Sequence, residues 1–143
     1  MSFDTPHSPQ SREINNVAAL KVPPHSVDAE QAVLGGLMLD NTEWDNLADV
    51  LLPEDFYRPE HQIIFRVMSQ QSEASSPIDV VTLVESLNSL NELEGAGGVE
   101  YLGELTDNAR GTANIHAYAE IIRERAILRR LISVANGIAN SGY

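Results

Sequence analysis

The stretch HAYAEIIRERAILRRLISVANGIANSGY, residues 116–143, decides the fold. On a helical wheel of about 100° per residue, Ile115, just before this stretch, shares one side of the helix with Tyr118, Ala119, Ile121, Ile122 and Ala126 from its first half. Past the arginine-rich middle the apolar arc is displaced by roughly a third of a turn or more, and it holds Ile127, Leu128, Leu131, Ile132, Val134, Ala135 and Ile138. We therefore predict one helix with two apolar faces, each of which packs against a different structural unit.

The stretch PHSVDAEQAVLGGLMLD, residues 24–40, predicts another helix. Ser26 is a suitable N-cap, and Val33, Leu34 and Leu37 fall on one side at helical spacing. Two glycines inside a helix cost about 1 kcal/mol each relative to alanine. We therefore expect Gly35 and Gly36 to allow the close approach of a neighbouring helix.

Four more helices are predicted between these two. The first is marked by Asp40 and Glu43, which resemble a capping pair, and the second by Pro59, which suits a first helical turn. Asp79 is a suitable cap for the third, and the glycine-rich segment 95–98 separates the third helix from the fourth. The apolar sets are Trp44, Leu47, Ala48 and Leu51; Ile63, Ile64, Val67 and Met68; Val80, Leu83, Val84 and Leu87; and Val99, Leu102 and Leu105. A strand is the alternative for IDVVTLV, residues 78–84, but no partner strand is visible.

These patterns predict an all-α domain with a compact head of about six helices and a C-terminal helix that projects from it. Thr112 or Asn114 is expected to cap that last helix. The predicted divisions are a flexible tail at residues 1–22, a helical head at residues 23–122 and a projecting helix at residues 123–143.

Composition excludes several classes of protein. No apolar run approaches the roughly 18 residues that span a bilayer, no secretory signal is visible, and the chain has no cysteine, so the cytoplasm is the expected compartment. The chain has nine basic and 21 acidic residues. Between Ser26 and Asp107 the imbalance is larger, with two basic residues, Arg58 and Arg66, and seventeen acidic ones. Because nucleic-acid binding normally needs a basic surface, this region is a poor candidate for gripping DNA.

No catalytic, cofactor-binding or metal-binding residue is predicted. The histidines lack the spacing of a zinc site, and Glu60-His61 is expected to be a solvated pair. The segment GAGG, residues 95–98, lacks the preceding strand and the following Gly-Lys-Ser/Thr of a phosphate-binding loop. Glu43, Asp45 and Asp49 are interpreted as a solvated face.

Five blocks of sequence, in order, resemble the N-terminal domain of DnaB-type bacterial replicative DNA helicases, especially those of proteobacteria. The blocks are LKVPPHSVDAEQAVLGGLMLDN, EDFYRPEHQIIF, SPIDVVTL, GGVEYLGEL and TANIHAYAEIIRERAILRRLI, and the resemblance covers about residues 20 to 143. It implies a hexameric, ATP-driven helicase whose N-terminal domains form a collar, built as a trimer of dimers, above a motor ring that uses ATP and Mg²⁺ and encircles DNA. The chain is expected to lack that motor and its Walker motifs, and so to be non-catalytic.

The resemblance also implies partners: other copies of the domain, the C-terminal domain of primase, and a helicase loader. The last helix would be the first arm of a dimerisation hairpin, with its second face, Ile127 to Ile138, covered by the second arm and a neighbouring subunit. The implied primase contacts are Asp28, Tyr101, Ile132 and Ile138. The alternative for Tyr101 is packing in the core, and the alternative for Ile132 and Ile138 is contact within the hairpin or the dimer only. The alternative function is a free-standing helical adaptor unrelated to replication.

Overall fold

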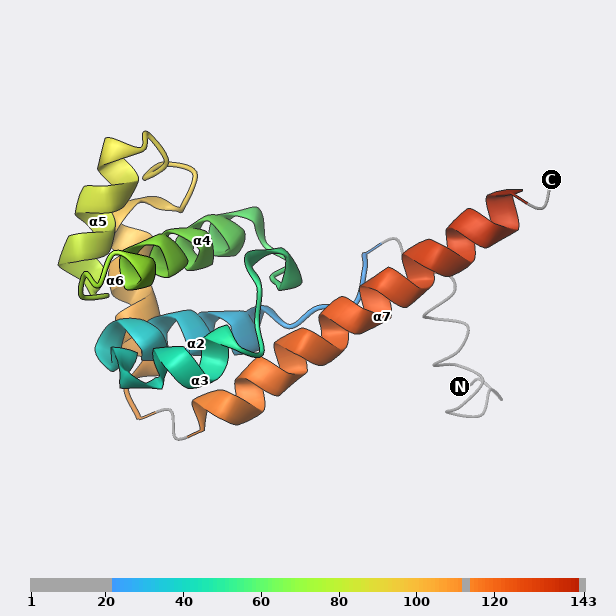
Figure 1. Ribbon diagram of the computed structural model, residues 1–143, viewed down its shortest axis with the longest axis horizontal. Helices are drawn as coiled ribbons and strands as arrows, with labels where there is room; N and C mark the ends of the chain where they lie inside the picture. Colours follow the sequence, from blue (N-terminus) through green and yellow to red (C-terminus); the bar gives the residue numbers. More distant parts are fainter. Residues whose placement is uncertain (1–21, 112–113, 142–143) are drawn as a thin grey trace, which may run out of the picture.

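The computed structural model describes residues 22–111 and 114–141, and within these ranges it contains six α-helices, two 3₁₀ turns and no strand. The predicted all-α class is confirmed. Figure 1 shows a head from which the last helix projects. In chain order the elements are α2 (Val27–Leu39), η1 (Asn41–Glu43), α3 (Trp44–Ala48), η2 (Pro53–Asp55), α4 (Pro59–Glu73), α5 (Val80–Ser89), α6 (Gly98–Ala109) and α7 (Ile115–Ser141).

Helix α2 lies at the centre of the head and packs against both α6 and α7. The predicted cap is confirmed, because the Ser26 hydroxyl accepts a hydrogen bond from the Ala29 amide at 3.2 Å. The role of the two glycines is confirmed as well. A Cβ atom on Gly35 would lie 2.0 Å from the carbonyl oxygen of Leu105 in α6, and one on Gly36 would lie 2.9 Å from Cδ1 of Ile115 in α7.

The second predicted helix is shorter than expected. Asp40 caps the 3₁₀ turn η1, accepting from the Thr42 amide at 3.1 Å, rather than the helix itself. Helix α3 ends at Ala48, so Leu51 lies beyond it, although the Leu51 side chain is still buried. The chain must leave the helical conformation here, because Leu52 precedes a proline and takes up an extended backbone.

The predicted starts of α4 and α5 are confirmed. Pro59 occupies the first turn of α4, and Asp79 accepts the Thr82 amide at 2.9 Å while the Thr82 hydroxyl accepts the Asp79 amide at 3.0 Å. Segment 80–89 is therefore a capped helix and not a strand. Phe56, which precedes α4, is fully buried, and its ring lies 4.9 Å from that of Phe65.

Helix α6 follows the predicted glycine-rich break, with Gly97 at a φ of 103° before it. Leu102 and Leu105 are buried as expected, but Val99 is 52% exposed. The prediction for Val99 was wrong because the buried stretch of α6, which holds Leu102, Leu105, Thr106 and Ala109, begins one turn later. Val99 shares their side of the helix at about 100° per residue, but it lies in the first turn, before that stretch.

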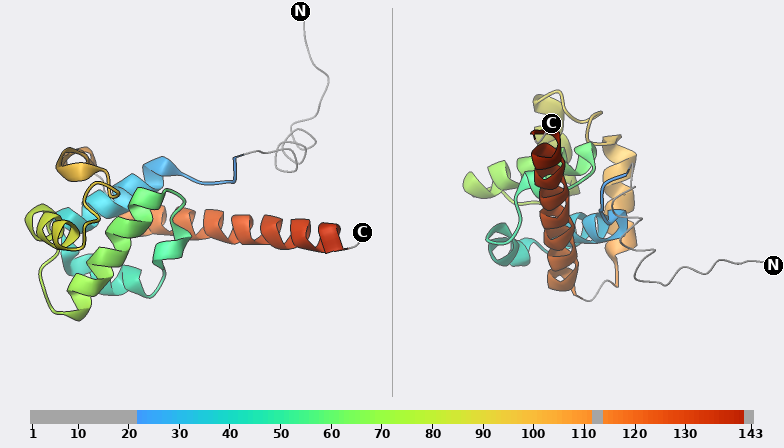
Figure 2. Two further views of the ribbon diagram at one scale, coloured as in Figure 1. Left: turned by 90° about the horizontal axis from the view of Figure 1, so that it is seen from above. Right: turned by 90° about the vertical axis from the view of Figure 1, so that its right-hand side faces the viewer.

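Helix α7 starts at a cap formed by Asn114, whose side chain accepts the Ala117 amide at 3.1 Å; Thr112 lies outside the described residues, as does most of the predicted tail. The first apolar face packs on the head as predicted, with Ala119, Ile122 and Ala126 buried and Ile115, Tyr118 and Ile121 against the core. The rest of α7 extends away from the head (Figure 2). Among the described residues no helix is long and apolar enough to cross a bilayer.

Candidate protein-interaction surface

The second half of α7 carries the second predicted apolar face, except for Ile132. That side chain is half-buried and lies with Arg129 and Ser133 in the lining of a hollow on the side of the helix toward Pro23 and Pro24. Ile127, Leu131, Val134 and Ile138 fall within roughly 60° of one another at about 100° per residue, so they form one stripe along the helix. We call this stripe, together with Leu128 and Ala135 at its edge, the outer face. Its large side chains are exposed in this chain, with exposed fractions of 40% for Ile127, 39% for Leu128, 60% for Leu131, 59% for Val134 and 68% for Ile138.

The arginine-rich middle of α7 fastens the helix to the head. One guanidinium nitrogen of Arg129 donates to the carbonyl of Pro24 at 2.8 Å, and another donates to the carbonyl of Asp55 at 2.7 Å. The neighbouring Arg130 forms an ion pair with the side chain of Asp55, which is fully buried. Contacts between the head and α7 therefore continue past residue 122 to residue 130.

Aromatic rings complete this attachment. The Arg129 guanidinium carbon lies 5.5 Å from the centroid of the Tyr57 ring, and His25 stacks on Tyr57 with centroids 4.0 Å apart. Burial lowers the pKa of Arg129, and the carboxylates of Glu30 and Asp55 oppose that shift. A guanidinium keeps its charge in proteins, so the contact with the Tyr57 ring is a cation–π interaction. The segment before α2, the turn η2 and α7 thus meet at one point.

We expect Arg129→Ala to loosen the projecting half of α7 and to lower the free energy of unfolding by about 1 to 3 kcal/mol, because two charge-assisted hydrogen bonds to carbonyls are lost. Urea titration measures the stability, and hydrogen exchange of the amides of residues 126–131 reports the loosening. Arg129→Lys should recover only part of the loss, since an ammonium cannot reproduce the planar fork. Unchanged exchange in Arg129→Ala would contradict this attachment.

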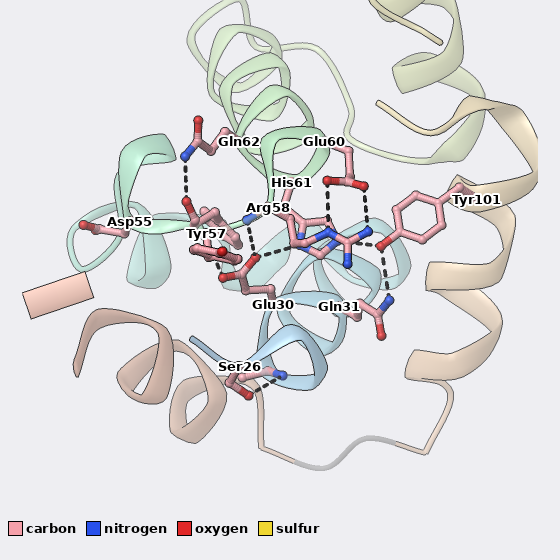
Figure 3. Close-up of polar contacts among 12 residues, drawn as sticks. Ser26, Glu30, Gln31, Asp55, Tyr57, Arg58, Glu60, His61, Gln62 and Tyr101 are labelled. Carbon is pink, nitrogen blue, oxygen red and sulfur yellow. Dashed lines mark hydrogen bonds and ion pairs between the residues drawn. The ribbon is translucent and has the colours of Figure 1, made fainter. Parts of the chain in front are cut away.

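A second group of polar side chains lies inside the head (Figure 3). Glu30 on α2, fully buried, accepts hydrogen bonds from the amides of Tyr57 and Arg58 at 2.8 and 3.3 Å. Its carboxylate also lies 2.7 Å from Nδ1 of His61, whose Nε2 lies 2.5 Å from the hydroxyl of Tyr101. The prediction that Glu60-His61 is a solvated pair was wrong, because His61 has no exposed surface.

The partners of His61 assign the hydrogen-bonding role of each ring nitrogen in the neutral imidazole. Because a carboxylate only accepts, Nδ1 donates to Glu30, and Nε2 of a neutral ring then accepts the Tyr101 hydroxyl proton. The amide of Gln31 donates to the same hydroxyl oxygen at 3.2 Å, which completes the network. Burial raises the pKa of Tyr101, so its hydroxyl keeps its proton at neutral pH. This network connects α2, α4 and α6.

Glu60, the sequence neighbour of His61, points elsewhere. It binds Arg58 at 2.8 Å, and the hydrogen bond from that guanidinium lowers the pKa of Glu60 to about 2. Arg66 is likewise paired, with Glu92 at 2.5 Å. Both basic residues of the segment from Ser26 to Asp107 therefore already have carboxylate partners. Among the described residues no group of three or more His, Cys, Asp or Glu is arranged to hold a metal ion.

The four candidate contact residues lie in two areas. Asp28 is exposed and borders a surface hollow with Gln31, whose amide reaches the Tyr101 hydroxyl. Tyr101 is half-buried against the core. Ile132 and Ile138 are on the projecting half of α7, where Ile132 is half-buried and Ile138 is exposed. The structure thus places Asp28 and Tyr101 on the head, each beside Gln31 but with no contact between them described, and it places the two isoleucines on the projecting helix.

The head is helical, it binds the middle of a long helix through Arg129 and Arg130, and it leaves one apolar face of that helix exposed. This arrangement is typical of a helical interaction domain. Residues 22–124 match the profile of the DnaB-like helicase N-terminal domain. The chain belongs to this family, which confirms the resemblance seen in the sequence.

Relatives and solved structures agree with this assignment. The chain is 48% identical over 126 residues to the replicative DNA helicase DnaB of Haemophilus influenzae, covering 88% of this chain and 27% of that protein, and 45% identical over 123 residues to that of Geobacillus stearothermophilus, covering 86% and 27%. The fold is similar to the crystal structure of the N-terminal domain of DnaB helicase from Mycobacterium tuberculosis, with a TM-score of 0.81 and 35% identity over 85% of this chain and 88% of that one.

A further solved structure shares the fold at lower identity. It is the N-terminal domain of DnaB helicase from Helicobacter pylori, described with its interactions with primase, and it matches with a TM-score of 0.67 and 24% identity over 94% of this chain and 98% of that one. The chain therefore spans almost the whole of the solved N-terminal domains but about a quarter of the full-length relatives.

Proposed function

We propose that this chain is the collar domain of a hexameric replicative DNA helicase and that it serves subunit assembly and the docking of primase. The observation that carries the proposal is the outer face of α7, a row of exposed apolar side chains on a helix that Arg129 and Arg130 fasten to the head. An exposed apolar patch of this kind marks a protein interface. In the assembly it is covered by the second arm of a hairpin and by a neighbouring subunit.

The full-length protein is proposed to be an ATP-dependent helicase that acts in the cytoplasm at the replication fork. Support comes from the family and from the relatives, which are replicative DNA helicases about four times as long as the matched region. ATP and Mg²⁺ would be bound by a motor domain, and DNA would pass through the full-length ring. The acidic surface of this domain suits contact with proteins better than contact with phosphates.

Primase, self and a helicase loader are the proposed partners. The proposed primase contacts are Asp28, Tyr101, Ile132 and Ile138, and the fold shared with the Helicobacter pylori domain, described with its interactions with primase, supports this partner. The alternative, a helical adaptor unrelated to replication, has no support among the helicase relatives.

The combined substitution of Leu131→Asp and Ile138→Asp tests the proposal. Burying the outer face contributes several kcal/mol at about 25 cal/mol per Å², and a buried unpaired carboxylate opposes association. We expect the dissociation constant for self-association, measured by sedimentation equilibrium, to rise by at least roughly 100-fold, which corresponds to about 2.7 kcal/mol. At concentrations where the parent chain is monomeric, the melting temperature of the variant should equal that of the parent, because both side chains are exposed and association then adds nothing to stability.

Ser133→Asp is the matched control, since it adds a carboxylate to an exposed position on the opposite side of the same helix. It should leave self-association intact. The same three proteins titrated with a primase C-terminal domain give a second readout, in which the double variant should bind more weakly than the control. A chain that is monomeric at high concentration, or a double variant that associates normally, would refute the assembly role.

A further inference from the structure

The side chain of Tyr101 joins the buried polar network of the head to the surface. His61 is fully buried, whereas Tyr101 is half-buried. The two rings are nearly parallel, with an angle of 8° between their planes and 5.9 Å between their centroids. In Figure 3 the Tyr101 side chain extends from α6 with its hydroxyl toward His61 on α4. A residue that reaches the surface is therefore held from inside the head.

The network fixes His61 before it reaches Tyr101. The carboxylate of Glu30 is itself held by the backbone amides of Tyr57 and Arg58. It lies 2.7 Å from Nδ1 of His61, and this contact sets both the orientation of the imidazole and the nitrogen that carries the proton. Nε2 is thus presented to the Tyr101 hydroxyl at 2.5 Å as a fixed acceptor.

Two further contacts hold the Tyr101 ring. The amide of Gln31 donates to its hydroxyl oxygen at 3.2 Å. At the other end of the side chain, the backbone of Gly97 lies so close to the ring that a Cβ there would be 2.6 Å from Cδ2 of Tyr101. Gly97 has a φ of 103°, which favours glycine in any case. The ring is therefore restrained at its hydroxyl and at its base.

These contacts limit what Tyr101 can offer to a partner. A phenol has one proton to donate, and here His61 accepts it, so the hydroxyl has none left for another molecule. What remains is the exposed part of the ring, which suits contact with an apolar side chain. Because the ring is already restrained, a partner that packs on it avoids the entropy cost of ordering the side chain.

We propose that His61 is a positioning residue, which holds the Tyr101 ring in the conformation that primase binds, and that the ring rather than the hydroxyl makes the contact. This inference rests on the proposed function, in which Tyr101 is a primase contact. Core packing and partner contact, the two alternatives for Tyr101, then apply to different parts of one side chain. The hydroxyl end anchors the residue, and the exposed part of the ring binds.

Two substitutions remove the same hydrogen bond from opposite sides. His61→Asn keeps an N–H donor close to the position of Nδ1 for Glu30 but has no counterpart of Nε2, and Tyr101→Phe removes the hydroxyl. We expect each to weaken binding of the primase C-terminal domain about 2- to 10-fold in calorimetric titration of the full chain. The double variant should bind no more weakly than either single variant. Tyr101→Ala should weaken binding at least roughly 30-fold.

A second readout separates positioning from a general loss of stability. Three-bond NMR couplings across χ1 of Tyr101 should show one rotamer in the parent chain and averaging between rotamers in His61→Asn and in Tyr101→Phe. Leu47→Ala is the control, because it opens a cavity in the core from α3, a different helix. It should lower stability but leave both the Tyr101 rotamer and the affinity for the primase domain unchanged.

Several results would overturn the proposal. Weaker binding by Tyr101→Phe with unchanged binding by His61→Asn would mean that the hydroxyl contacts primase directly. A single Tyr101 rotamer in His61→Asn would mean that His61 does not hold the ring. If His61→Asn does not fold, Tyr101→Phe decides alone, since weaker binding with an unchanged rotamer would refute positioning. A parent chain that does not bind the primase domain would refute the proposed function and the partner named here, while the couplings would still show whether His61 holds Tyr101.

Discussion

Replacing Gly35 by alanine is expected to lower the free energy of unfolding by at least about 3 kcal/mol, at the upper end of the cost of overpacking a core. The added Cβ would lie 2.0 Å from the carbonyl oxygen of Leu105 and 2.8 Å from the Cβ of Ala109. One of these obstacles is backbone, so no rotamer change relieves the clash. Helices α2 and α6 would have to separate, and the leucines packed between them would lose contact.

Thermal and urea unfolding measure this effect, and Gly103→Ala is the matched control. Gly103 also lies inside a helix, but a Cβ there would meet nothing within 4 Å. Alanine should therefore stabilise the helix by up to about 1 kcal/mol. Opposite signs for the two glycine substitutions are the expected result. If Gly35→Ala were tolerated as well as Gly103→Ala, the described approach of α2 to α6 would be incorrect.

Glu30→Ala is expected to cost about 3 to 5 kcal/mol, because it leaves buried hydrogen-bond donors without an acceptor. The amides of Tyr57 and Arg58 and the Nδ1 proton of His61 would all lose their partner. The junction of α2, α4 and α6 should loosen with them. Urea unfolding gives the loss of stability, and the NMR signals of the His61 ring report whether its tautomer is still fixed.

Asp28→Ala controls for the loss of a carboxylate from α2, since Asp28 lies two residues earlier and is exposed. Its effect on stability should be within about 0.5 kcal/mol. Glu30→Gln should fall between the two, because the amide keeps one acceptor oxygen but turns an N–H group toward other donors. Equal stability of Glu30→Ala and Asp28→Ala would mean that the buried network contributes nothing.

Local patterns predicted the features that depend on local physics. Ser26, Asp79 and Pro59 mark helix starts because caps act within one turn, and the cost of Gly35 and Gly36 pointed to a neighbouring helix. The periodicity of residues 115–138 separated the two faces of α7. In these cases residues that are close in sequence are also close in space. Sequence spacing was therefore sufficient to predict the helix caps and the helix faces.

Contacts between distant residues could not be predicted in the same way. His61 was interpreted through its neighbour Glu60, yet its partners are Glu30 and Tyr101, 31 and 40 positions away. The attachment of Arg129 uses backbone carbonyls, which leave no signature in side-chain identity. Burial of Glu30 was equally hidden, because an acid in the first turn of a helix is ordinarily explained by the helix dipole.

The attachment of α7 at Arg129 has a mechanical consequence. From that residue to Ile138 the helix overhangs by about 14 Å at 1.5 Å per residue, so it behaves as a cantilever with its support at the bonds to Pro24 and Asp55. A force on the free end of α7 is resisted by those bonds, and displacing that end requires either bending the helix or pulling on the segment that leads into α2. A force on the free end of α7 is therefore transmitted to the head at Pro24 and Asp55.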